Sequence, residues 1–203
     1  ALWVEAVEIG RRVVWLHTRG RRFADVAAGR PTGAPHIDDP AARPLVVSAI
    51  PGTAEKMPDE MSYDATTLSL SVGEGVIAPV SAAAVGYEVG GVNMLRKWFG
   101  YRRATRPQAK GKQSPLDDVR PASWPAAYTT DLLELLHQLT LVAELEPEQA
   151  DLLVRILAAP LITVNDLVEA EVLPVAAAER EPFPRTLREP KATPGFEQGV
   201  LGD

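Results

Sequence analysis

The first part of the chain carries apolar residues at the spacing of a helix. Ile9, Val13 and Leu16 lie three or four positions apart, which places them on one face of an α-helix. This pattern predicts an N-terminal helix over residues 1–23. Residues 24–44 are rich in Gly, Pro and Asp, so we expect them to form a surface loop.

Short extended segments follow. Leu45–Ile50 is an apolar run bounded by prolines, and Leu68–Val72 alternates apolar residues with serine, as a half-buried β-strand does. Gly73–Gly75 is expected to turn the chain, so that Val76–Val80 returns as a partner strand. Residues 45–89 are therefore predicted to hold a small mixed or antiparallel sheet.

Helical spacing returns in the second half of the chain. Leu95, Trp98 and Phe99 predict a helix over residues 91–103, with its basic residues mostly off the apolar face. A loop rich in Pro, Lys and Ser follows this helix. We expect Trp98 and Phe99 to be core residues, because large aromatic side chains at helical spacing usually pack inside.

A leucine-rich stretch comes next. Leu132, Leu136 and Leu139 line one face of a predicted helix, and Pro147 stands where the first turn of a second helix would begin. Residues 129–158 are therefore predicted to form a C-terminal αα-hairpin. The expected fold class is α+β, with one domain over residues 1–173 and a tail rich in Pro and Glu over residues 174–203.

Bulk composition excludes several classes of protein. The 203 residues include no cysteine, which removes disulfides and thiolate metal sites and fits a cytoplasmic location. The sequence has no apolar run of membrane-spanning length, so no membrane partner is expected. The net charge is −6, which by itself argues mildly against a nucleic-acid partner.

Charge is unevenly distributed, and this matters more than its sum. No acidic residue occurs from Val89 through Leu116, where the chain carries seven Arg or Lys residues. A second basic cluster lies in the predicted N-terminal helix, at Arg11, Arg12, Arg19, Arg21 and Arg22.

A search for catalytic chemistry finds little. The three histidines lack metal-ligand spacing, and His17 and His137 fit helical patterns as packed or surface residues. Gly73–Ala78 matches a dinucleotide-binding pattern, but Val76, Ile77 and Pro79 disfavour the helix that such a site requires. The Asn/Asp-Pro-Pro-aromatic motif of amino-methyltransferases is also absent. We therefore expect no catalysis by this chain alone.

The basic, aromatic segment is the strongest candidate for a binding site. Arginine and lysine neutralise phosphates, and arginine and asparagine also make paired hydrogen bonds to guanine and adenine. The residues alone leave two possibilities open, DNA binding and a solvated basic face. The candidate DNA-binding residues are Asn93, Arg96, Lys97, Tyr101, Arg102, Arg103, Arg106, Lys110 and Lys112.

At these residues the sequence resembles a known family. Tyr87–Gly91 and Leu95–Arg102 are similar to the C-terminal specificity domain of type ISP restriction–modification enzymes, which join nuclease, translocase, adenine methyltransferase and target recognition in one polypeptide. The similarity continues through Ser114–Val119, Trp124–Pro125 and Thr130–Val142 and includes Gly10–His17. It covers roughly residues 1–173.

The resemblance implies a DNA target-recognition module that partners double-stranded DNA and an upstream methyltransferase domain of the same chain. S-adenosylmethionine would then bind upstream, and this fragment would need no cofactor. The alternative is a protein-interaction module that docks through its leucine-rich helices. Salt dependence separates the two, because phosphate contacts weaken steeply with salt and apolar docking does not.

Overall fold

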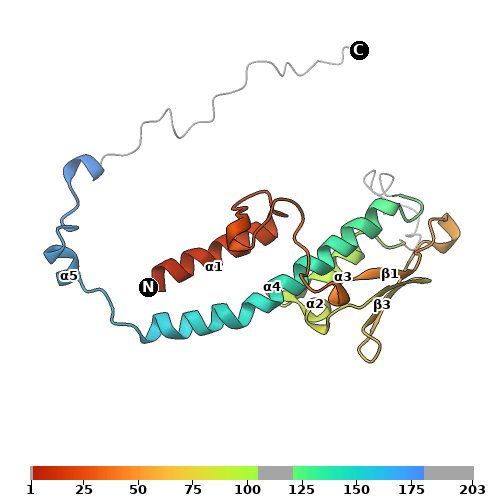
Figure 1. The fold of residues 1–203 in the computed structure, drawn as a ribbon. Helices are drawn as coiled ribbons and strands as arrows, with labels where there is room; N and C mark the ends of the chain where they lie inside the picture. Colours follow the sequence, from red (N-terminus) through yellow and green to blue (C-terminus); the bar gives the residue numbers. More distant parts are fainter. Residues whose placement is uncertain (1, 105–120, 181–203) are drawn as a thin grey trace, which may run out of the picture. The chain divides into compact units, whose positions relative to one another are not determined.

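A computed structural model describes residues 2–104 and 121–180. The chain is an α+β protein, and its contacts divide it into a unit of residues 1–158 and a second unit of residues 159–203. In the first unit a four-stranded sheet lies beside the long helix α4, and helix α1 runs alongside α4 (Figure 1). The predicted fold class is confirmed at this level.

The sheet is entirely antiparallel. Its strands are β1 (Leu45–Ser48), β2 (Met61–Asp64), β3 (Ser69–Val72) and β4 (Gly75–Ala78), in the order β1-β4-β3-β2. β3 and β4 form the hairpin that the sequence predicted, with Gly73 at a φ of 55° in its turn. β2 was not foreseen as a separate strand.

One face of the sheet forms most of the core. Leu70, Val72 and Ile77 are fully buried and pack with Leu132 and Leu136 of α4. The short helix α2 (Ala82–Gly86) also packs on α4, and its N-cap residue Ser81 shares a hydrogen bond of 2.9 Å with Thr140.

A β-hairpin with strands of two residues each directly precedes helix α3. β5 (Glu88–Val89) and β6 (Val92–Asn93) pair across Gly90 and Gly91, which both have positive φ. α3 then runs only from Met94 to Gly100. The helix begins later than the predicted 91–103 because the hairpin occupies its expected first turn, and it ends earlier, at Gly100.

The N-terminal helix α1 spans Leu2–His17 and is shorter than the predicted 1–23. Arg19 and Gly20 both adopt positive φ, which ends the helical path. A Cβ on Gly20 would overlap the carbonyl oxygen of Gly33, so only glycine fits this turn.

Residues 24–44 form turns rather than a purely exposed loop. They contain the 3₁₀ turns Val26–Ala28 and Pro40–Ala42, and they bury Arg30 and Ile37. The Arg30 side chain donates to the Phe23 carbonyl at 2.9 Å and pairs with Glu8. These contacts fix the segment against α1.

The predicted αα-hairpin over residues 129–158 is wrong. Ala126–Ala158 is one helix, α4, with Pro147 inside it. Proline lacks one backbone donor, but α4 contacts α1 on both sides of that position. On the N-terminal side of Pro147, Leu145 packs with Trp15 and Leu16 of α1. On its C-terminal side, Arg155 pairs with Glu5 of α1. These tertiary contacts keep the helix continuous.

The second unit is described as far as Arg180. It contains helix α5 (Val164–Glu169), which Thr163 and Asp166 stabilise through a capping box, and the 3₁₀ turn Ala177–Arg180. Most of the predicted tail, residues 181–203, lies outside the described residues. None of the described helices has the length and apolar content needed to cross a membrane.

Candidate nucleic-acid interface

Asn93 fixes the start of α3. Its side-chain oxygen accepts a hydrogen bond from the Arg96 N–H at 2.9 Å, and its side-chain amide donates to the Val85 carbonyl at 2.7 Å. Both ends of the amide are therefore engaged within the protein, as is typical of a helix N-cap. The sequence signal for this role was an asparagine directly before a helical pattern.

The apolar side of α3 joins the core. Leu95 is fully buried, Phe99 is nearly so, and Trp98 is half-buried. Trp98 meets the rings of Trp124 and Tyr128 edge-on, with centroids 6.2 and 6.4 Å apart. The core role expected for Phe99 is confirmed, and Trp98 packs at the margin of the core.

Arg102 is also turned inward. Its guanidinium lies 4.2 Å from the Trp98 ring centroid and 5.3 Å from that of Tyr128, and it donates to the Trp98 carbonyl at 3.3 Å. Its Nε is buried without a hydrogen-bond partner in the described part of the chain. Stacking between the two rings ties the end of α3 to α4. The i, i+4 spacing from Trp98 was the available sequence signal.

Three other cations, Arg96 and Lys97 on α3 and Arg103 just after its end, are here called the basic face. All three are exposed. Arg103 donates to the Asp59 carbonyl oxygen at 3.4 Å, which leaves its charge uncompensated. Among the described residues, no carboxylate lies within ion-pair distance of the basic face.

Tyr101 lies beside this surface. It is 59% exposed, and the Lys97 ammonium lies 5.0 Å from its ring centroid. The remaining candidates, Arg106, Lys110 and Lys112, fall outside the described residues. The structure thus brings Arg96, Lys97, Tyr101 and Arg103 to one exposed region, and it uses Asn93 and Arg102 to hold α3.

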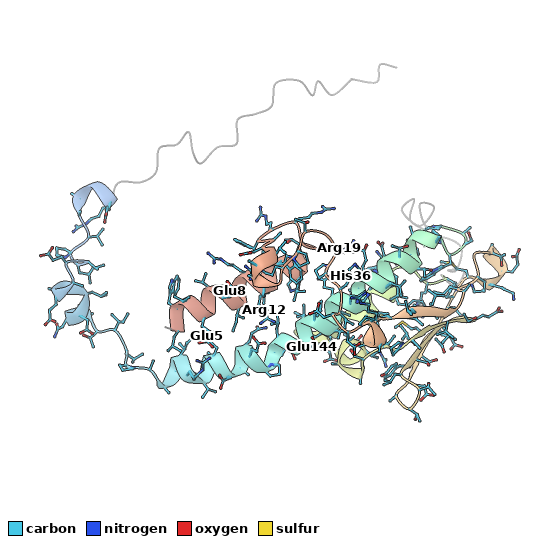
Figure 2. The ribbon with its side chains drawn as sticks, in the orientation of Figure 1. Glu5, Glu8, Arg12, Arg19, His36 and Glu144 are labelled. Atoms are coloured by element: carbon cyan, nitrogen blue, oxygen red, sulfur yellow. The ribbon has the colours of Figure 1, made fainter. Side chains whose placement is uncertain are left out.

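The N-terminal basic cluster has a different electrostatic environment. Arg11 lies 3.7 Å from Glu8, Arg12 lies 2.7 Å from Glu148, and Arg19 lies 3.0 Å from Glu134. Figure 2 shows Glu5 and Arg12 between α1 and α4, and Arg19 close to α4. Acidic partners therefore neutralise much of this cluster, although Arg21 and Arg22 are exposed.

His137 is a packed core histidine, one of the two possibilities that its helical pattern left open. It is 6% exposed, its Nδ1 accepts a hydrogen bond from the Ile37 N–H at 3.1 Å, and the His36 ring meets it edge-on at 4.8 Å. Burial, together with the nearby charges of His36 and Arg43, lowers the pKa of His137 to about 4. The ring is therefore neutral near pH 7.

Two pockets in the described part of the chain do not resemble an active site. A pocket of about 510 Å³ is lined by the paired Arg19 and Glu134, and one of about 370 Å³ lies between β1 and the start of α4, beside Trp124. Across the described residues, no group of His, Asp and Glu side chains is placed to hold a metal ion. The uncompensated basic face is the more distinctive surface.

One comparison with known proteins gives a match. A family model described as "Type ISP C-terminal specificity domain" matches residues 1–135. No curated protein and no solved structure matches the chain. The matched range includes α1, the sheet, α3 and the first part of α4.

Proposed function

The chain belongs to the type ISP C-terminal specificity domain family, and from that premise we propose that it recognises a target sequence in double-stranded DNA through the basic face of α3. Membership of this family implies DNA target recognition within a restriction–modification enzyme. The finer assignment, which residues contact DNA, rests on the electrostatics of the described surface.

One observation carries the assignment to α3. Arg96, Lys97 and Arg103 are exposed and lack a carboxylate partner in the described part of the chain. Three of the five arginines of the N-terminal cluster, Arg11, Arg12 and Arg19, already have acidic partners. A phosphate backbone gains most from cations whose charge is not already compensated, because each contact releases counterions from the DNA. The chain has a net charge of −6, but a negative total does not exclude a locally positive surface.

The candidate residues divide into two roles in this proposal. Arg96, Lys97, Tyr101 and Arg103 contact DNA, and Arg106, Lys110 and Lys112 extend the contact along the segment that follows. Asn93 and Arg102 act as positioning residues. They hold α3 through the N-cap and through the stack on Trp98 and Tyr128.

In the whole enzyme, this domain supplies sequence readout to a methyltransferase domain that precedes it in the polypeptide. Adenine methylation requires the base to leave the duplex, and S-adenosylmethionine would be held by that preceding domain. No residue of this chain is assigned to the methyl-transfer step.

The proposal is tested by selecting bound sequences from random duplex DNA with the chain, followed by sequencing. We expect enrichment of a defined motif, or at the least binding that weakens steeply as salt rises. A chain that retains no duplex DNA at low salt would overturn the proposal.

A second candidate function is protein docking through α4. Leu153, Val154 and Leu157 are 56%, 65% and 74% exposed near the end of this helix, which is unusual for large apolar side chains. Docking of this kind would be nearly insensitive to salt. Binding to the other domains of the enzyme that survives high salt, without affinity for DNA, would favour it.

A further inference from the structure

No contact or backbone angle in the described part of the chain requires glycine at position 100. It is the last residue of α3, it is exposed, and its φ is not in the positive range that favours glycine. A Cβ built at this position meets nothing within 4 Å among residues 2–104 and 121–180. Glycine in a helix is less favourable than most other residues, so α3 tolerates a destabilising residue at an open position.

The neighbours of Gly100 are the cations of the basic face. Arg96 and Lys97 precede it by four and three residues, and Arg103 follows it by three, which places all three on the same side of a helical path. The Arg103 N–H bonds to the Phe99 carbonyl at 2.9 Å, so the chain continues to turn past Gly100. Gly100 is thus a bare patch of backbone among three uncompensated cations.

Gly10 of α1 provides an internal comparison. It too is an exposed helical glycine with open space around a built Cβ. The arginines next to it, Arg11 and Arg12, are paired with Glu8 and Glu148. The two glycines are therefore alike in being helical and exposed, but the cations near Gly10 have acidic partners and those near Gly100 have none among the described residues.

We propose that Gly100 is the point at which a DNA strand approaches the α3 backbone most closely, with Arg96, Lys97 and Arg103 contacting phosphates on either side of it. This inference rests on the proposed function and specifies the contact. A glycine lets a ligand backbone come closer than any side chain would, and closer approach brings the flanking cations within charge-assisted hydrogen-bond distance of phosphate oxygens.

The test compares side chains of increasing size at the two glycines. Gly100→Ala, Gly100→Gln and the matched Gly10→Gln are made in the full chain, and binding to a labelled random-sequence duplex is measured at low salt. Gly100→Gln should weaken binding by about tenfold or more, because it displaces the strand from several phosphate contacts, and Gly100→Ala should have a smaller effect. Gly10→Gln should leave binding unchanged.

Melting temperatures separate this effect from unfolding. All three variants should melt at or above the wild-type temperature, because each replaces glycine by a better helix former in open space. Wild-type affinity in Gly100→Gln would overturn the inference. If Arg96→Ala with Lys97→Ala still weakened binding in that case, the DNA-binding function would stand without the close approach.

Discussion

Arg102 and Arg103 are neighbours in the sequence but have opposite environments. Arg102 stacks on Trp98 and Tyr128, and Arg103 projects outward with its charge uncompensated. Successive residues of a helical turn point about 100° apart, so a run of arginines does not define a binding surface by itself.

This difference predicts separable effects of two substitutions. Arg102→Ala should lower the free energy of unfolding by about 1–2 kcal/mol, because the stack and its packing are lost. Arg103→Ala should change it by less than about 0.5 kcal/mol and should weaken DNA binding instead. Urea unfolding and duplex binding measured on both variants check this, and a stable Arg102→Ala variant would contradict the positioning role.

His137 predicts a pH dependence of stability. Burial lowers its pKa to about 4 in the folded chain, whereas an unfolded histidine titrates near 6.5. As pH falls, the unfolded state takes up a proton first, so stability is retained above about pH 6.5 and is lost between about pH 6.5 and 4. The loss between about pH 7 and 5 should be about 2 kcal/mol.

Urea unfolding at the two pH values measures this loss. His137→Gln keeps an acceptor for the Ile37 N–H and should reduce the pH dependence, whereas His17→Gln on the exposed end of α1 should not. Equal pH dependence in wild type and His137→Gln would contradict the account. Carboxyls with lowered pKa, such as Asp64, act at lower pH and do not confuse the comparison.

The sequence predicted the helices and strands whose residues show a strong periodic pattern. It missed the elements whose formation depends on contacts with distant parts of the chain. The β3–β4 hairpin follows from alternation and two glycines. β2 has only four residues, Met61–Asp64, and its identity depends on pairing Met61 and Tyr63 with Val72 and Leu70. Such pairing between separate segments is not visible in one short run.

α4 gives the clearest example of this limit. Proline is common in the first turn of a helix, so Pro147 was interpreted as a helix start, but its position in the sequence cannot indicate that α1 supports α4 on both sides of it. Leu145 and Arg155 make that support with partners more than 100 residues away. Local propensity was therefore overridden by packing.

Continuity of α4 is directly measurable, because the chain has no cysteine and can be labelled at will. Spin labels at Thr130→Cys and Val154→Cys, both exposed, should lie about 36 Å apart along one helix, from 24 residues at 1.5 Å each. A distance well below about 25 Å would restore the helical hairpin.

For the whole molecule, total charge is a poor guide to function. The chain carries 27 acidic and 21 basic residues, yet the basic face of α3 has no acidic partner in the regions that the structure describes. The sequence located this segment through its acid-free run. It could not show that Glu134 and Glu148 pair with Arg19 and Arg12 of the other basic cluster, because those contacts join residues far apart in the chain.

The family match and the electrostatics of the described surface support different parts of the account. The match covers residues 1–135 and gives no base-contacting positions. The structure adds which side of α3 is available, and it assigns Asn93 and Arg102 to the support of that side.

The most direct test is a salt titration of duplex DNA binding with two variants of equal charge change. Arg96→Ala, Lys97→Ala and Arg103→Ala are combined in one, and Arg11→Ala, Arg12→Ala and Arg19→Ala in the other. The first should weaken binding and reduce the salt slope by about 0.9 for each lost phosphate contact, while the second should bind nearly as wild type. Equal losses in both variants, or a larger loss in the second, would contradict the assignment of DNA recognition to the basic face of α3.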